Sequence, residues 1–568
     1  MIRIWKMMNS KKIIFIVTLI FLEAVGFLVL PTLAAEILNL AAQGIETGAV
    51  RTIGIVMIVV TLITIVIAVF STRLSAQESQ GLGNTLRKKL FEKIMSFSSQ
   101  ELSSFGTSTL ITRTSNDVMQ IQLVTMLMLR LIIMSPIVMV VSFLFAFQRE
   151  AQLAWVFAVT IPAIAIGVGL ILRKASPIFR SIQKKTDRLN QIFREGLTGM
   201  RVIRAFNTTS YEEERFDEAN QDFRDTSIRA NTILALMLPV MIIVMGISNV
   251  LIFTQGTQLI SLGIMDIGNL VAFVQYGVQM LISILQVAML FFFLPRAEVS
   301  AERILEVLDT ELHIRDESDV DTLGPVDKVN LELKDVAFGF KGAERDAVCD
   351  INMNLEPGDT LAIIGGTGSG KTTIANLITR LYEATSGEIL VNGKDIGTIK
   401  QHELRENIGY APQQALLFSG TIRSNLQYGN PQASEEEMWH ALSIAQADFV
   451  EDLDRRVEAG GRNFSGGQRQ RLNIARAIVS QPNIYIFDDS FSALDFKTDA
   501  KLREALKPET EDAIVIIIAQ RVNTVVNADE ILVLDNGQIV GRGSHEELMA
   551  TNRLYQDIVS SQTKGAGE

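Results

Sequence analysis

The sequence predicts an α-helical membrane domain of six spans that is fused to a separate α/β domain. Two observations support this prediction. Apolar residues make up 48% of the 568-residue chain, and the excess precedes about residue 300, in runs long enough to cross a bilayer as helices. Beyond that point, short runs rich in Ile and Val alternate with helical patterns, which is typical of buried parallel strands.

Each predicted span is an apolar run of roughly 20 residues. The runs lie near residues 13–34, 52–71, 122–147, 153–172, 232–254 and 268–294. The long connections at 73–121 and 173–231 hold most of the basic residues of this half. Because basic connections stay in the cytoplasm, we expect these connections and both termini to be cytoplasmic.

The first run has an alternative interpretation as a secretory signal peptide. Lys11 and Lys12 precede it, and it ends near Thr32–Ala35. The run is longer than a usual signal core, however. Cleavage would also leave an odd number of spans and would place the C-terminal domain outside the cytoplasm. We therefore expect this run to be a membrane span.

The composition changes within a few residues after the last span. Residues 296–309 have helical apolar spacing and carry the last helix into water, and acidic, turn-prone residues follow. We predict a membrane domain at 1–309, a linker at 310–328 and an α/β domain at 329–568. The net charge of -11 argues against a nucleic-acid partner. The single cysteine, Cys349, excludes an intramolecular disulfide and a Cys-based metal cluster.

The strongest local motif is Gly-Gly-Thr-Gly-Ser-Gly-Lys-Thr at residues 365–372. It follows a predicted strand and opens a predicted helix, as a P-loop does. Backbone N–H groups and Lys371 would bind ATP phosphates, and the hydroxyl of Thr372 would bind Mg²⁺. The predicted ATP-binding residues are Gly365, Gly366, Thr367, Gly368, Ser369, Gly370, Lys371, Thr372 and Thr373.

The buried strands of the α/β domain are predicted from four short apolar runs. They are Thr360–Ile364, Ile484–Phe487, Ala513–Ala519 and Ile531–Leu534. The second run ends in Asp488, where a P-loop ATPase has the aspartate that binds Mg²⁺. An acidic residue after a buried strand has little specificity alone, so this assignment depends on the motifs around it.

Residues 463–471, Asn-Phe-Ser-Gly-Gly-Gln-Arg-Gln-Arg, resemble the LSGGQ signature of ATP-binding cassette (ABC) proteins, with Phe464 in place of Leu. The family's other motifs occur in the same order. Gln413 resembles the Q-loop residue that also contacts Mg²⁺, Asp495 ends a D-loop-like Ser-Ala-Leu-Asp, and Phe340 resembles the aromatic that stacks on adenine. The resemblance covers nearly the whole chain and is closest to bacterial multidrug exporters, as a half-transporter.

The resemblance implies a second half-transporter as the partner. In this family the signature turn of one subunit closes on the γ-phosphate held by the P-loop of the other. The residues expected at the partner's ATP are Phe464, Ser465, Gly466, Gly467 and Gln468. The two long connections are expected to be helical, with tips near Leu102–Leu110 and Ala205–Ser210 that touch the ATPase domains.

Two residues depart from the family pattern. Asp489 stands where the family has the Glu that activates water, so its carboxylate is set back by about 1.5 Å. Displacements near 1 Å can cost on the order of a hundredfold in rate. Gln520 stands where the family has a histidine, and an amide cannot carry the imidazolium charge. The resemblance thus implies a slow catalytic set of Asp489, Gln520 and Gln413, in a heterodimer whose partner carries the usual Glu and His.

The membrane half contains polar residues that are candidates for a substrate cavity. Gln275, Gln279 and Gln286 share one face of the sixth span, Tyr276 adjoins them, and Glu23 lies in the first span. Polar groups in lipid are costly, so they should face a cavity or another helix. Pairing of Glu23 with Arg130 or with a backbone group is an alternative to a substrate role.

These observations predict ATP-driven export of small amphipathic or drug-like molecules, hydrophobic or cationic, across a bacterial cytoplasmic membrane. ATP and Mg²⁺ are the expected cofactors, and the lipid bilayer surrounds the helical half. Lipid or peptide export is the nearest alternative, because the motifs do not discriminate cargo. A non-transporting ATP-gated channel or sensor would share every motif.

Overall fold

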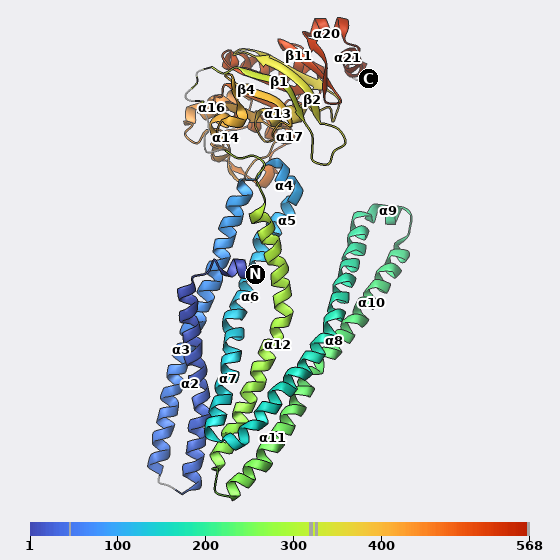
Figure 1. The fold of residues 1–568 in the computed structure, drawn as a ribbon. Helices are drawn as coiled ribbons and strands as arrows, with labels where there is room; N and C mark the ends of the chain where they lie inside the picture. Colours follow the sequence, from blue (N-terminus) through green and yellow to red (C-terminus); the bar gives the residue numbers. More distant parts are fainter. Residues whose placement is uncertain (45–46, 317–321, 324–325, 327, 565–568) are drawn as a thin grey trace. The chain divides into compact units, whose positions relative to one another are not determined.

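The computed structural model divides into two compact units (Figure 1). One comprises Met1–Met95 and Thr107–Thr310, and the other Ser96–Gly106 and Glu311–Glu568. The structure describes residues 1–44, 47–316, 322–323, 326 and 328–564. Several residues of the predicted linker, 317–321, 324–325 and 327, lie outside the described residues.

The membrane unit contains six helices that are long and apolar enough to cross a bilayer, which confirms the predicted number of spans. Their elements are α2 (Ser10–Ala42), α3 (Thr47–Met95), α5 (Thr107–Thr112) through α7 (Ile133–Arg149), α8 (Ala151–Thr198), α10 (Thr209–Ala235) with α11 (Met237–Ser261), and α12 (Ile267–Asp309). A short helix, α1 (Ile2–Trp5), precedes them. The helices α3 and α8 have 49 and 48 residues, so they extend far beyond the apolar runs.

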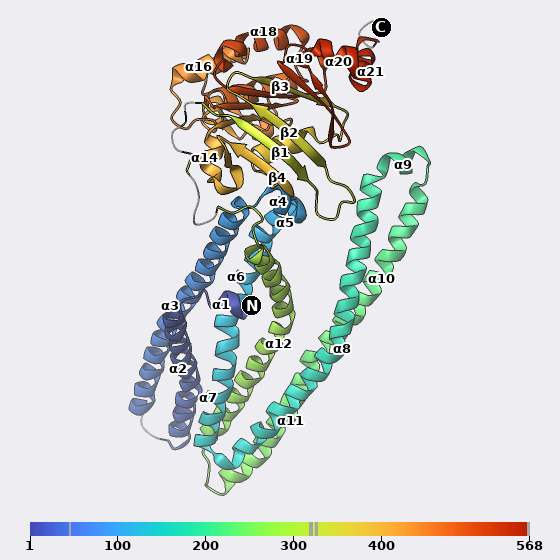
Figure 2. The ribbon, with the colours of Figure 1, turned by 45° about the horizontal axis from the view of Figure 1, so that its top comes forward.

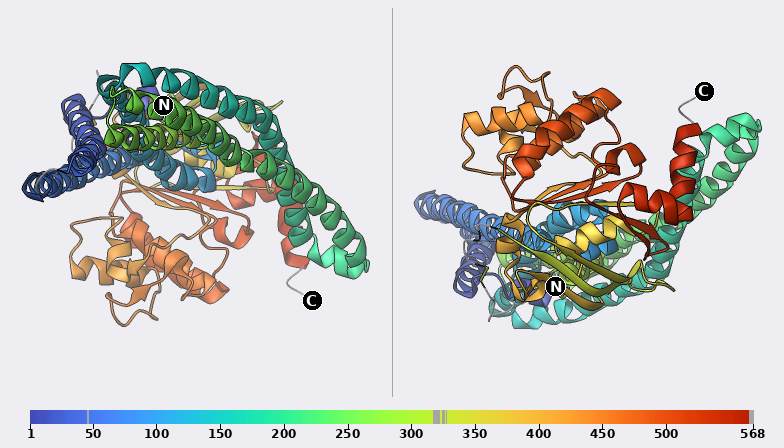
Figure 3. Two further views of the ribbon diagram at one scale, coloured as in Figure 1. Left: turned by 90° about the horizontal axis from the view of Figure 1, so that it is seen from below. Right: turned by 90° about the horizontal axis from the view of Figure 1, so that it is seen from above.

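The long connections are therefore mostly helical. The first contains the short helix α4 (Ser99–Phe105), which belongs to the second unit, and the second contains the short helix α9 (Met200–Ala205). Figures 1 and 3 show α8 lying beside α10 and α11 along their length.

The third span contains two wider π-helical segments. They are η1 (Arg113–Asp117) and η2 (Met128–Ile132), on either side of α6 (Val118–Leu127). Pro136 has no N–H to donate to the carbonyl of Ile132, where η2 ends, and such a missing bond favours a local widening. The π segment η2 carries Arg130.

The second unit is built on two sheets. A six-stranded sheet has the order β12-β11-β3-β10-β9-β6, and an antiparallel sheet has the order β2-β1-β4-β5. The strands are β1 (Leu331–Phe338), β2 (Val348–Leu355), β3 (Thr360–Gly365), β4 (Ser386–Val391), β5 (Lys394–Asp395), β6 (Ile408–Ala411), β9 (Ile484–Asp488), β10 (Ile514–Ala519), β11 (Glu530–Asp535) and β12 (Gln538–Gly543). A small pair, β7 (Gly420–Thr421) and β8 (Arg456–Val457), stands apart. The four predicted strands are β3, β9, β10 and β11, and they lie in one sheet in parallel.

Helices cover the six-stranded sheet. They are α13 (Lys371–Ile378), α14 (Gln401–Glu406), α15 (Ile422–Leu426), α16 (Glu435–Ile444), α17 (Gly466–Ile478), α18 (Phe496–Leu506), α19 (Val522–Val525), α20 (His545–Thr551) and α21 (Arg553–Lys564). Figure 2 shows α16 and α18 on the side of β3 that faces away from β1 and β2.

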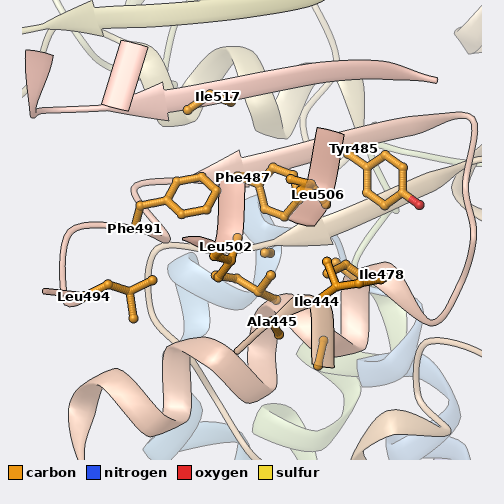
Figure 4. Packing of buried hydrophobic residues seen from close by; sticks show 14 of the residues in the cluster. Ile444, Ala445, Ile478, Tyr485, Phe487, Phe491, Leu494, Leu502, Leu506 and Ile517 are labelled. Carbon is orange, nitrogen blue, oxygen red and sulfur yellow. The ribbon is translucent and has the colours of Figure 1, made fainter. Parts of the chain in front are cut away.

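The strands β3, β9, β10 and β11 of the six-stranded sheet are buried on both faces, which explains their continuous apolar runs. In β10, Val515 and Ile517 pack into one core, and Ile514 and Ile516 pack into another. The first core includes Phe487 with residues of α16, α17 and α18 (Figure 4). The sheet thereby holds the loops at its strand ends in fixed positions.

Candidate nucleotide-binding site

The carboxyl ends of four adjacent parallel strands bring the distant motifs together. The P-loop follows β3, and Gln520 follows β10. Asp488 ends β9 and Asp489 follows it, and Gln413 lies just after β6. The strands are aligned so that their ends coincide: β10 pairs with β3 and with β9, and β9 pairs with β6. Ligands of open α/β sheets bind at this end of the strands.

The P-loop connects β3 to α13 through a tight backbone path. Gly368 and Gly370 have φ values of +81° and +102°, which side chains other than glycine rarely adopt. Lys371 is buried, and its Nζ donates to the carbonyl oxygens of Gly365 at 2.9 Å and Gly366 at 2.6 Å. Burial lowers the pKa of Lys371, and the neighbouring aspartates oppose this effect. The lysine and the backbone N–H groups at the start of α13 can bind phosphate oxygens.

Asp488 and Thr372 form an oxygen-rich pair beside the P-loop. The Thr372 hydroxyl donates to the Asp488 carboxylate at 3.1 Å, and the Tyr410 hydroxyl lies 3.5 Å from the other carboxylate oxygen. Burial raises the pKa of Asp488. Hydroxyl and carboxylate oxygens are ligands that Mg²⁺ prefers, usually together with substrate phosphates. Within the described residues no cluster of three or more His, Cys, Asp or Glu could hold a metal alone, so this pair fits a nucleotide-bound Mg²⁺.

Asp489 lies at the centre of the site in a backbone conformation that is uncommon for a residue other than glycine, with φ of +48°. Its Oδ2 accepts a hydrogen bond from the amide of Gln413 at 3.3 Å and from the amide of Gln520 at 3.1 Å. Burial raises the pKa of Asp489, and the bond from Gln413 lowers it. The two residues that depart from the family pattern are therefore in direct contact.

The signature turn begins α17 with a reciprocal cap. The Ser465 side chain accepts from the backbone N–H of Gln468 at 3.3 Å, and the Gln468 side chain accepts from the N–H of Ser465 at 2.9 Å. Ser465 and Gly466 are exposed. The turn thus presents the N-terminus of a 13-residue helix to its surroundings, an arrangement that attracts anions.

Phe464, which replaces the usual Leu of the signature, anchors this turn. Its side chain is buried, with Phe449 edge-on at 6.1 Å between ring centroids and the Arg455 guanidinium 4.9 Å from its ring. Gly467 lies so close to the carbonyl of Ala493 that a Cβ would be 3.2 Å away. The aromatic residue therefore fills the core position without displacing the turn.

Two further predicted residues lie at the edges of the site. Phe340 is 45% exposed and contacts Phe338 and Tyr382 edge-on, at 5.0 and 5.6 Å, so its ring is available for stacking. Asp495 caps α18 by accepting from the N–H of Thr498 at 3.0 Å.

The membrane candidates have partners within the chain. Glu23 is buried and paired with Arg130, at 2.8 and 3.1 Å, which is the alternative left open by the sequence. Ser71 donates to the same carboxylate at 2.6 Å. The side chain of Gln286 accepts from Ser135 at 2.8 Å, and Tyr276, fully buried, lies 2.6 Å from the Thr32 hydroxyl. Gln275 is exposed and Gln279 is half-buried.

Sequence reasoning missed two polar contacts in the second unit. Glu101 of α4 is buried and accepts from the backbone N–H of His313 at 2.9 Å and lies 2.7 Å from its ring nitrogen. The spacing of Ser98 and Glu101 is a capping-box signal, but nothing local indicates a residue 212 positions away. The other missed residue is Gln562, which contacts the turn that contains Gln520.

Comparison with known proteins agrees with this geometry. Residues 13–285 match the ABC transporter transmembrane region, and residues 348–492 match the ABC transporter family. The chain is 40% identical to an uncharacterised ABC transporter ATP-binding protein of Mycobacterium tuberculosis, over 95% of this chain and 94% of that protein. It is 34% identical to YfiB of Bacillus subtilis, an uncharacterised ABC transporter ATP-binding protein, over 94% of this chain and 93% of that protein.

The fold is similar to that of a bacterial Atm1-family ABC exporter with ATP bound, with a TM-score of 0.80, 22% identity, and coverage of 97% of this chain and 98% of that chain. The chain therefore belongs to the ABC transporter family, as a half-transporter in which a membrane region with six candidate spans is fused to an ATPase domain.

Proposed function

We propose that this chain is one half of a heterodimeric bacterial exporter, in which its own ATP site hydrolyses slowly and its signature turn completes the partner's site. The observation that carries the proposal is the contact between Asp489 and Gln520, at 3.1 Å. Both residues depart from the family pattern, and both lie where an attacking water would be activated.

The geometry supports slow hydrolysis for a physical reason. A general base must reach the proton that it removes. The Asp489 carboxylate is set back by about 1.5 Å relative to a glutamate, and one of its oxygens already accepts from two amides. Thr372, Asp488 and Gln413 would hold Mg²⁺, which would neutralise charge on the β- and γ-phosphates. Lys371 and the P-loop would bind ATP whether or not it is hydrolysed.

The signature turn supports a role in a second site. Ser465 and Gly466 are exposed at a helix N-terminus, and one subunit needs only one phosphate cradle for each nucleotide. ATP that binds preferentially between two ATPase domains would stabilise their closed pair, and hydrolysis would remove this bias. The tips of the two long connections would transmit closure. Val202 of α9 and Phe206, which follows α9, are exposed apolar residues that are available for such a contact.

The direct experiment restores the family residues at this site. The double change Asp489→Glu with Gln520→His, in the complex with the native partner, should raise hydrolysis at this chain's site by up to about a hundredfold. Vanadate trapping of a photo-cross-linkable ATP reports which subunit hydrolyses. The change Asp535→Glu, at an exposed carboxylate that ends the neighbouring strand β11, is the matched control. A purified homodimer of this chain that equalled the paired complex in ATPase and transport would contradict the proposal.

We also propose that the cargo is small and amphipathic, hydrophobic or cationic, and that Gln275 and Gln279 line its route. These amides lie on one face of the sixth span, and polar side chains in lipid are costly unless they face protein or water. Export of fluorescent cationic dyes from inverted vesicles, compared with flipping of labelled lipids, separates this cargo class from the lipid alternative.

A further inference from the structure

The C-terminal helix α21 contacts the turn between β10 and α19. The side-chain amide of Gln562 donates to the carbonyl of Gln520 at 2.7 Å and accepts from the backbone N–H of Val522 at 2.8 Å. One side chain thus makes two hydrogen bonds to backbone groups on either side of Arg521. Gln562 lies 42 positions after Gln520 and 40 positions after Val522 in the chain.

This contact supplies a helix cap that the local sequence does not provide. The N-terminal cap of α19 is Arg521, whose side chain does not cap the helix in the described structure. Helix N-termini carry unpaired N–H groups, which are usually satisfied by Ser, Thr, Asp or Asn at the cap position. Gln562 performs this role from a distant helix, so the conformation of the turn depends on the position of α21.

The same turn makes two contacts with the nucleotide site. The side chain of Gln520 donates to Asp489 at 3.1 Å, and the guanidinium of Arg521 donates to the carbonyl of Leu494 at 3.2 Å, next to Asp495. A shift of the turn would therefore move an amide at the catalytic carboxylate and would also release a contact to the segment before α18.

We propose that Gln562 is a positioning residue of the ATP site: it fixes the turn 520–522 so that the Gln520 amide faces Asp489 and the terminal phosphate. The inference rests on the proposed function for the role of Gln520. Since Gln520 lies beside Asp489, where the reacting phosphate is expected, loosening of the turn affects a bound triphosphate more than a diphosphate.

The test uses the full-length chain in lipid nanodiscs and the variants Gln562→Ala and Gln562→Glu. The glutamate retains an acceptor for the Val522 N–H and loses the donor to the Gln520 carbonyl. The probes are fluorescent (mant) forms of AMP-PNP and ADP. Loss of one or two hydrogen bonds should accelerate release of mant-AMP-PNP roughly fivefold for the alanine variant and less for the glutamate variant. Release of mant-ADP should remain unchanged. Hydrogen exchange at the Val522 amide should become faster in the alanine variant, which lacks the acceptor.

The control is Gln556→Ala in the same helix, because Gln556 donates to the carbonyl of Met549 at 2.7 Å, outside this turn. Equal acceleration for both nucleotides would indicate a merely structural role and would overturn the proposal. Unchanged release of the triphosphate from Gln562→Ala, or unchanged exchange at Val522 in that variant, would also overturn it. Failure of Asp489→Glu with Gln520→His to raise hydrolysis would instead contradict the proposed slow site. The expected difference between the release rates of mant-AMP-PNP and mant-ADP would not be affected by that failure.

Discussion

Asp489 and Gln520 differ from the family's Glu and His by one methylene group and by one potential charge. Because their side chains share a hydrogen bond, their effects on hydrolysis should not be additive. On the proposed function, a histidine at 520 beside the short Asp489 would orient a carboxylate that is still set back from the expected water. A glutamate at 489 would reach the water but would still face an uncharged amide. We therefore expect the pair to act as one unit, and the double reversion tests this expectation.

Phe340 offers a second prediction for a single residue. Phe340→Ala should weaken ATP binding roughly tenfold, because stacking of a base on an aromatic ring contributes about 1–3 kcal/mol. Phe340→Trp should preserve the affinity. Equilibrium binding of fluorescent ATP to the full-length chain measures both variants.

The control for Phe340 is Tyr428→Ala, which removes an exposed aromatic ring that stacks on Phe418, outside the site. An alanine variant at 340 that bound ATP as tightly as the wild type would show that Phe340 does not stack on adenine.

Local spacing made part of the site predictable. The P-loop and the signature are short motifs that depend on one strand end or one helix start, so residue order alone predicts them. Asp488 is predicted from the motifs around it. Gln562 was not predictable in this way. A lone glutamine on a polar helix is unremarkable in sequence, and its bonds to the turn at 520–522 exist only because the fold brings α21 to the end of β10.

Helix α4 is the element in which local sequence and tertiary contact combine. Ser98 and Glu101 cap it, and the same carboxylate accepts from the backbone of His313, so the tip is fastened to the segment that opens the ATPase unit. Burial alone would raise the pKa of Glu101. The hydrogen bonds from Ser98 and His313 outweigh burial and hold the pKa at about 2, below the usual 4.5.

This lowered pKa predicts a pH dependence. A carboxylate with a depressed folded-state pKa stabilises the folded state fully above about pH 4.5, and this contribution is lost as the pH falls toward 2. Glu101→Gln should cost about 2 kcal/mol at neutral pH. The difference in melting temperature from wild type should shrink steadily below pH 4.5.

Glu311→Gln is the control for the pH experiment, since Glu311 is an exposed carboxylate of the same unit. If the difference in melting temperature between wild type and Glu101→Gln stayed constant from pH 7 to pH 3, it would contradict the assigned pKa.

The ion pair of Glu23 and Arg130 connects α2 with the π segment of the third span. Removal of one partner leaves a buried charge without its counter-ion, at a cost of about 3–5 kcal/mol, whereas removal of both is often tolerated. We expect Arg130→Gln to destabilise the chain more than Glu23→Gln with Arg130→Gln together. Thermal unfolding in one detergent compares the variants.

The same variants separate a structural role from a substrate role. If the double variant is stable and still exports cationic dyes, the pair is structural. If the double variant is stable and selectively loses the export of cationic dyes, Glu23 contacts the cargo. The sequence could identify both residues as unusual, but only the packing of the helices decides that they meet.

At the scale of the whole chain, hydropathy and strand patterns sufficed to predict six spans and an α/β domain. Both predictions depend on whether each side chain favours water or an apolar environment, and this preference is a property of the individual residue. The π segments η1 and η2 escaped prediction because they depend on a few missing or shifted backbone hydrogen bonds. The contact between Glu101 and His313 escaped for a different reason, since it joins residues that are 212 positions apart in the chain.

A prediction for the whole assembly follows from the exposed signature turn. Ser465→Ala should impair hydrolysis at the partner's site by on the order of tenfold or more, because it removes a hydrogen-bonding group at a phosphate cradle. ATP binding to this chain's own P-loop should remain unchanged. Site-resolved trapping in the paired complex distinguishes the two sites.

Ser544→Ala is the matched control for the signature variant, because Ser544 caps α20 with a reciprocal Glu547 in the same way. Equal losses at both ATP sites after Ser465→Ala would contradict the assignment of the turn to the partner.

The continuity of α3 has a mechanical consequence. Its 49 residues contain no proline, and at 1.5 Å per residue they form a rod roughly 70 Å long. If such a rod pivots by about five degrees at one end, its other end moves by about 6 Å, slightly more than one helical turn. A rotation that is small enough to leave side-chain contacts near the pivot intact therefore produces a large displacement at the far end of the helix.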